Sequence, residues 1–222
     1  MHFDKNFVKL TGEIVSDITV AYEHQGIKFV NFYLASKRLS ETKDVLLVVA
    51  KSAVIPEGVG KGSRVSLTGD YRVYQNRFSN ITSRNAYVVY TTDIELDATG
   101  VDVNEIDIIG YPVSVKPVRS TATGRSLREV VIATNKYFTK ADGSSRSKSY
   151  YINCIAWSNA ISFFEDTDPS ELIEVKGRIQ SRPFKKAGDD AEHVAYEVSI
   201  STVNDFVPDN SEDDTSEGVN DN

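Results

Sequence analysis

The sequence predicts an all-β protein made of two tandem copies of one small barrel, followed by an acidic tail. Three observations predict this organisation: an internal repeat offset by about 98 residues, strand-type alternation inside the repeated blocks, and very little helical pattern. The length of 222 residues leaves room for two domains of about 100 residues each.

The repeat emerges when the chain is compared with itself. Its blocks keep their order and spacing while few residues are identical, and chance does not place five such blocks in register. The matches are Asn6 with Asn104, Gly12 with Gly110, Gly26 with Gly124, 32–36 with 130–134, 45–50 with 151–156, 65–69 with 173–177, and 88–96 with 194–202. Each copy therefore contains the same succession of elements.

The repeated blocks have the composition of strands. Residues 65–68, 173–176 and 196–200 alternate apolar and polar side chains, and β-branched and aromatic residues dominate the blocks. An Asp-Gly step at 142–143 predicts a hairpin between 130–138 and 148–157. Only short helices are expected, at 158–165 and as a degenerate turn at 52–55.

Five short strands with one short helix between the third and fourth describe an OB-type Greek-key barrel, although a small β-sandwich would have a similar pattern. We expect a first barrel at 1–96, a linker at 97–103, a second barrel at 104–207 and a disordered tail at 208–222.

The charge is concentrated in the tail. The net charge is −7, from 25 Lys and Arg against 32 Asp and Glu, and six of those acids lie after Pro208 with no base among them. The two barrels are thus close to neutral. There is no apolar run long enough to span a membrane and no secretory signal, and the single cysteine, Cys154, excludes an intramolecular disulfide. We expect a soluble, cytoplasmic protein.

No catalytic or metal-binding pattern is present. His2, His24 and His193 lack the spacing to carboxylates or cysteine that metal sites use. Glu165, Asp166 and Asp168 form one acidic cluster, which is better explained as a solvated helix end. The sequence predicts a protein that is not an enzyme and needs no cofactor or metal.

The second copy resembles the bacterial and phage single-stranded DNA-binding protein family. The similar segments are Asn104 to Tyr111, Thr123-Gly124 with Val131 to Asn135, Tyr151 to Trp157 followed by Asn159-Ala160, and Val175-Lys176-Gly177-Arg178-Ile179-Gln180-Ser181-Arg182-Pro183-Phe184. The last segment is the most specific. The first copy is connected to the family only through the internal repeat.

Two features depart from the family pattern. Most bacterial members have one OB fold per chain and form tetramers, whereas a tandem chain would need only a homodimer to supply four barrels. The family's tail usually ends in acids followed by an apolar tip such as Ile-Pro-Phe, but this chain ends at 218–222 without one. The usual recruitment of replication or recombination proteins through the tail is therefore in question.

The resemblance implies four base-stacking aromatic residues in the second copy: Phe138, Tyr151, Trp157 and Phe184. Strand alternation by itself places one set on a single face: Tyr151, Asn153, Ile155 and Trp157. The set expected to face the core is Tyr150, Ile152, Cys154 and Ala156. The expected phosphate contacts in this copy are Lys136, Lys140, Arg146, Lys148, Arg178, Arg182 and Lys185.

The first copy has fewer aromatic residues at the equivalent positions. It retains Tyr74 as a candidate for stacking, with candidate phosphate contacts at Lys37, Arg38, Lys51 and Arg72. We expect an asymmetric protein in which the second copy stacks bases and the first adds charge and possible assembly contacts. A diverged but equally active first copy is the alternative.

The leading hypothesis is sequence-tolerant binding of single-stranded DNA during replication, recombination, repair or transfer of plasmid or phage DNA. The rival is an OB-fold protein-interaction module with weak DNA affinity, which the near-neutral body favours. RNA is a further possible ligand because stacking does not sense the 2′-hydroxyl. The acidic tail is expected to compete with DNA, to contact basic partners or only to solubilise the chain.

Overall fold

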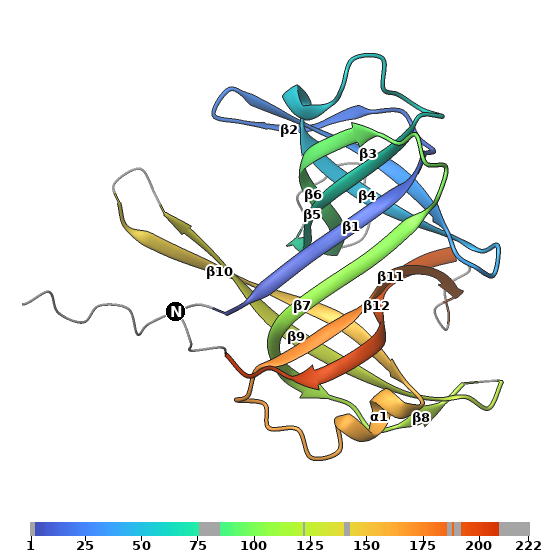
Figure 1. The fold of residues 1–222 in the computed structure, drawn as a ribbon, viewed down its shortest axis with the longest axis vertical. Helices are drawn as coiled ribbons and strands as arrows, with labels where there is room; N and C mark the ends of the chain where they lie inside the picture. Colours follow the sequence, from blue (N-terminus) through green and yellow to red (C-terminus); the bar gives the residue numbers. More distant parts are fainter. Residues whose placement is uncertain are drawn as a thin grey trace, which may run out of the picture.

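Twelve strands form one continuous hydrogen-bonded series that closes into two barrels, stacked one above the other in Figure 1. The computed structural model describes residues 3–75, 85–121, 123–139, 143–185, 188 and 192–208. The strand order is β2-β3-β4-β6-β5-β1-β7-β11-β12-β10-β9-β8, and the pairings β1–β3 and β7–β9 close the two barrels. No described helix is long and apolar enough to cross a membrane.

The first barrel contains six strands and one short 3-10 turn, η1. Their bounds are β1 (Lys5–Ile14), β2 (Thr19–His24), β3 (Ile27–Lys37), β4 (Lys43–Lys51), η1 (Ser52–Val54), β5 (Arg64–Gln75) and β6 (Asn85–Leu96). The parallel pairing of β4 with β6, among otherwise antiparallel neighbours, gives the OB topology.

The second barrel repeats this series. Its elements are β7 (Val103–Val115), β8 (Arg119–Ser120), β9 (Ser126–Thr139), β10 (Ser145–Trp157), α1 (Asn159–Phe163), β11 (Ile173–Lys185) and β12 (Glu192–Asp205). The predicted tandem OB folds, the hairpin between β9 and β10 and both short helical turns are confirmed. The two short strands β2 and β8 were not predicted.

Four glycines show why the repeat persists in the sequence. A Cβ on Gly12 would stand 2.2 Å from the carbonyl oxygen of Ala35, where the first barrel closes. A Cβ on Gly110 would stand 2.4 Å from the carbonyl oxygen of Ala133, at the same place in the second barrel. The other pair is Gly69 and Gly177, at the bulges of β5 and β11. Close backbone contact excludes any side chain there.

The last block of the predicted repeat needs a correction of three residues. Val48 pairs with Val89 in the first barrel, and its equivalent Cys154 pairs with Val198 in the second. Residue 89 therefore corresponds to residue 198, whereas the predicted match placed it at 195. An alternating strand offers several similar registers, and only the pairing partner and the bulge select one.

The two barrels share one sheet and one core. Strands β1 and β7 pair antiparallel from Lys5 opposite Ile109 to Thr11 opposite Val103. Asn6 donates its amide to the carbonyl of Tyr71 and accepts from its N–H, at 2.7 and 2.9 Å, and Asn104 does the same with Ile179. Equivalent residues of the two copies thus make equivalent contacts, and the two barrels are related by a pseudo-twofold axis.

Candidate nucleic-acid interface

The second barrel exposes three of the four predicted aromatic residues. Tyr151 is 58% exposed on β10, Phe138 is 38% exposed on β9, and Phe184 is 37% exposed on β11. Trp157, at the end of β10, is half-buried. Tyr137, beside Phe138 on β9, is 39% exposed and was not predicted, so four exposed aromatic rings on one small barrel form a notable apolar surface.

Alternation along β10 is confirmed with one exception. The four residues predicted to face the core are between 0 and 3% exposed: Tyr150, Ile152, Cys154 and Ala156. Ile155 lies on the same strand face as Tyr151 but is only 4% exposed, so this face is covered at its centre. Burial also raises the pKa of the Cys154 thiol far above its usual value, which makes this cysteine an inert core residue.

Trp157 and Phe184 each lie against a cationic or titratable neighbour. The Arg125 guanidinium carbon is 4.7 Å from the centre of the Trp157 ring. The Phe184 ring centre is 5.5 Å from that of His193, its register partner on β12. The Trp157 ring beside the Arg125 guanidinium suits a nucleotide, which presents a base and a phosphate together.

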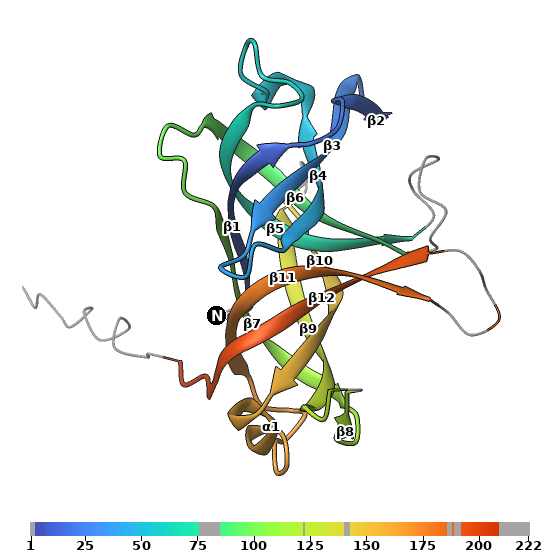
Figure 2. The same ribbon diagram turned by 90° about the vertical axis from the view of Figure 1, so that its right-hand side faces the viewer.

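The aromatic residues are carried on two long hairpins. Figure 1 shows the β9–β10 hairpin reaching to the left and the β11–β12 hairpin to the right, and Figure 2 shows the second of these projecting from the molecule. Phe138 lies opposite Arg146 near the end of the first hairpin. The four rings are therefore spread over the barrel and not gathered in one pocket.

The predicted phosphate contacts divide into exposed and internally paired residues. Four of the phosphate contacts predicted in the second barrel are exposed: Arg146, Lys148, Arg182 and Lys185. Arg182 contacts Glu197 at 3.3 Å. In the first barrel Lys37 is exposed and paired with Glu41, and Lys51 is half-buried. Lys140 lies outside the described residues.

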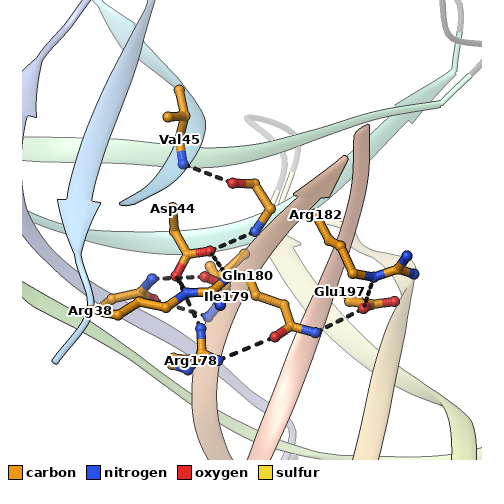
Figure 3. Close-up of polar contacts among 10 residues, drawn as sticks. Arg38, Asp44, Val45, Arg178, Ile179, Gln180, Arg182 and Glu197 are labelled. Carbon is orange, nitrogen blue, oxygen red and sulfur yellow. Dashed lines mark hydrogen bonds and ion pairs between the residues drawn. The ribbon is translucent and has the colours of Figure 1, made fainter. Parts of the chain in front are cut away.

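Arg38 and Arg178 bind one buried carboxylate at the junction of the barrels (Figure 3). Arg38 Nε lies 2.8 Å and Arg178 Nη1 3.0 Å from Asp44 Oδ2, and the Asp44 side chain is 1% exposed. The hydrogen bond to Asp44 raises the pKa of Arg38, while burial lowers that of Arg178. Both arginines are thus committed to a contact between barrels, which the sequence did not predict.

Ser181 completes this junction. Its backbone N–H donates to Asp44 Oδ1 at 2.8 Å, and its hydroxyl accepts from the N–H of Val45 at 2.9 Å. Strand β11 of the second barrel is therefore tied to the start of β4 in the first. This arrangement holds the two barrels in one orientation.

The candidate residues on β5 also need correction. Tyr74 is 7% exposed and packs in an apolar cluster, and Arg72 is 9% exposed and paired with Asp70. Lys136 of β9 binds the same Asp70 carboxylate. The alternation of β5 gave no sign that Tyr74 would pack against neighbouring strands of its own barrel, or that Lys136 of the second barrel would bind Asp70.

The sequence also missed aromatic residues on the outer face of the first barrel. Tyr22, Tyr33 and Tyr90 are half-buried over the buried ring of Phe29. These rings lie on β2, β3 and β6, whereas the exposed aromatic residues of the second barrel lie on β9, β10 and β11. The alternation of residues 29, 31 and 33 was the available signal.

The comparisons with known proteins agree with this fold. Residues 103–206 match the model of the single-strand binding protein family. Wild-type single-stranded DNA binding protein from Thermus aquaticus is similar over 93% of this chain and 95% of its own, with a TM-score of 0.69 and 13% identity. A deletion mutant of that protein matches over 93% of this chain and 96% of its own, with a TM-score of 0.68 and 14% identity.

None of the curated proteins compared matches the chain. At 13 and 14% identity, the solved structures establish the shared fold. The family match covers the second barrel alone and confirms the resemblance drawn from its motifs. Residues 103–206 therefore match the single-strand binding protein family and form an OB fold, joined in this chain to a first barrel of the same fold.

Proposed function

We propose that this protein binds single-stranded DNA with little sequence preference, through aromatic stacking and cationic contacts on the second barrel. The observation that carries the proposal is the exposure of Tyr151, Phe138 and Phe184 on the barrel that matches the family. The Thermus aquaticus protein of similar fold is a single-stranded DNA binding protein. The family is one of binding proteins, and we propose a protective, non-enzymatic role in DNA replication, recombination or transfer.

Stacking would supply most of the affinity. Tyr151 stands on a strand whose inward neighbours are buried, so the backbone that carries its ring is already fixed before a base stacks on it. Each stacked base contributes about 1–3 kcal/mol and does not require a particular sequence. The exposed cations Arg146, Lys148 and Lys185 would neutralise phosphates beside the rings.

The test is a fluorescence anisotropy titration of labelled oligo-dT at several salt concentrations. We expect binding at low salt, with a log–log salt slope of about −0.7 for each phosphate neutralised. Tyr151→Ala together with Phe184→Ala should weaken binding about tenfold or more. Phe7→Leu is the matched control, because Phe7 is 45% exposed on β1, away from these rings.

Two results would overturn the proposal: no binding at low salt, or an affinity that neither salt nor the double substitution changes. The first would favour the protein-interaction module instead. Running oligo-U beside oligo-dT measures the preference for DNA over RNA. Light scattering on the same samples tests the further proposal that two chains associate to give four barrels.

A further inference from the structure

The seam at which β1 pairs with β7 joins a basic strand to an acidic one. Within the paired stretch, the outer face of β1 carries Lys5 and Lys9, and the outer face of β7 carries Glu105 and Asp107. Lys9 lies directly opposite Glu105 in the register, and Lys5 Nζ lies 2.5 Å from Asp107 Oδ2. Opposite residues of an antiparallel pair project from the same face, so both lysines lie beside carboxylates of the other barrel.

The repeat shows what two barrels of the same kind would place in this seam. β1 and β7 are equivalent strands offset by 98 residues, so the observed register can be applied to two copies of either barrel. Two second barrels would place Glu105 of each copy opposite Asp107 of the other. Two first barrels would place Lys9 opposite Phe7 of the other copy and diagonal to its Lys5 and Lys9. Like charges at such positions destabilise a strand pair.

The backbone contacts at the two ends of the seam are the same in both copies. Asp102, just before β7, accepts a hydrogen bond at Oδ2 from the N–H of Lys37 at 2.6 Å. Asp4, just before β1, accepts one at Oδ1 from the N–H of Asn135 at 2.8 Å. Each barrel supplies both the aspartate and the N–H, so two like barrels could form these bonds equally well. They hold the barrels together without selecting which barrels pair.

The side chains that flank the seam differ between the copies. Arg38 and Lys136 occupy equivalent positions, one residue beyond the N–H groups just described. Arg38 shares the Asp44 carboxylate with Arg178 of the second barrel. Lys136 instead binds Asp70 of the first barrel. Asp70 and Arg178 are themselves equivalent, because each follows the glycine at the bulge of its strand.

These junctions exclude a pair of second barrels. Such a pair would bring Lys136 of each copy against Arg178 of the other. The position of Asp44 is taken by Tyr150 in the second barrel, so no carboxylate would stand there to bridge the two cations. Charges that are partly buried and unpaired are costly. Two first barrels would meet opposite charges at this junction, so that pair is opposed at the seam alone.

We infer that the β1–β7 seam is a recognition surface that accepts one first barrel with one second barrel and rejects two barrels of the same kind. The edge of β1 fits an acidic strand, and the edge of β7 fits a basic one. Two second barrels are the pair most strongly excluded. One chain satisfies both edges with its own barrels, so chains that associate do so through another surface. The inference does not depend on DNA binding.

Charge reversal in the full chain reproduces the seams of like barrels. Lys5→Glu with Lys9→Glu gives four carboxylates, as two second barrels would, and Glu105→Lys with Asp107→Lys gives four lysines, as two first barrels would. We expect each double variant to lower the urea midpoint by about 0.5 M. The quadruple variant should recover most of this loss, because opposite charges again face each other. All differences should shrink in about 1 M NaCl, which screens exposed charges.

Lys61→Glu with Lys116→Glu is the matched control, because both lysines are exposed outside the seam and the net charge changes equally. Double variants no less stable than this control would overturn the inference. A quadruple variant that loses as much as the two double variants together would also overturn it. Lys5→Gln with Lys9→Gln covers a reversed variant that does not fold: its midpoint should depend less on salt than that of the wild type, and an equal dependence would contradict selection by charge.

Discussion

Asp44 is the residue on which the geometry between the barrels most depends. Its carboxylate is 1% exposed and bonds two arginines from different barrels and the backbone of Ser181. Ion pairs on open surfaces contribute little, whereas removing one member of a buried pair leaves an uncompensated charge. The repeat equates Asp44 with Tyr150 of the second barrel, and at the equivalent junction the carboxylate is Asp70, which binds Lys136 across the barrels.

Asp44→Ala should therefore lower the free energy of unfolding by about 3 kcal/mol, because Arg38 and Arg178 lose their shared partner. Urea denaturation measures the change. Glu129→Ala is the matched control, since the Glu129–Arg119 pair is 46 and 53% exposed and should contribute less than about 1 kcal/mol. A similar decrease in the free energy of unfolding for both variants would show that the buried Asp44 site contributes no more than an exposed ion pair.

Asp97 gives a pH-dependent prediction. Hydrogen bonds from the Thr99 hydroxyl and backbone N–H, with further help from Arg64 and Gly100, lower its pKa to about 2. The unfolded value is about 3.9, so the contribution of Asp97 to stability is present above that pH and is lost as the pH falls through about 2. Asp97→Asn should lower the urea midpoint at pH 7 and match the wild type near pH 2. A difference in urea midpoint between Asp97→Asn and the wild type that does not change with pH would contradict the lowered pKa of Asp97.

At the scale of elements, the strands, their faces and the hairpin between β9 and β10 could be predicted, and the contacts between the two barrels could not. Alternation correctly identified the core face of β10 because every second side chain is excluded from water by the barrel itself. It failed at Ile155, which is buried although it lies on the outward face, and at Tyr74, which packs against side chains of other strands. Arg178 shows the same limitation, since a surface cation and a cation bound to a carboxylate distant in sequence, here Asp44, have the same sequence pattern.

The closing contact of each barrel depends on glycine. Gly12→Ala would force a Cβ to 2.2 Å from the Ala35 carbonyl oxygen, so β1 and β3 must separate. We expect a loss of about 2–3 kcal/mol, which thermal and urea unfolding would detect. Gly60→Ala is the control because no atom lies within 4 Å of its Cβ position. If Gly12→Ala is as stable as Gly60→Ala, barrel closure does not require this approach.

At the scale of the whole molecule, two near-neutral barrels share one sheet and are followed by an acidic C-terminal segment. Residues 209–222 lie outside the described structure, and their charge is known from the sequence alone. The tandem fold could be predicted from the repeat because glycines and asparagines at matching positions of the two copies make backbone contacts, as Asn6 and Asn104 do. The aromatic surface of the first barrel escaped prediction because its rings come from three strands.

Removal of the acidic segment tests its proposed competition with DNA. A chain ending at Pro208 loses six carboxylates and no base. If these acids compete with phosphates for the cationic groups, the truncated chain should bind oligo-dT more tightly at low salt, and the difference should shrink as salt screens the charges. Equal affinity at every salt concentration would leave the tail only a partner-binding or solubilising role.

The most direct test of base stacking on the second barrel uses its tryptophan. Trp157 is the single tryptophan of the chain, so its emission reports one proposed stacking position without interference from another. We expect unlabelled oligo-dT to quench this emission to saturation and added salt to reverse the quenching. Emission that stays unchanged while anisotropy shows labelled oligo-dT bound would contradict stacking at Trp157 and place the DNA elsewhere on the molecule.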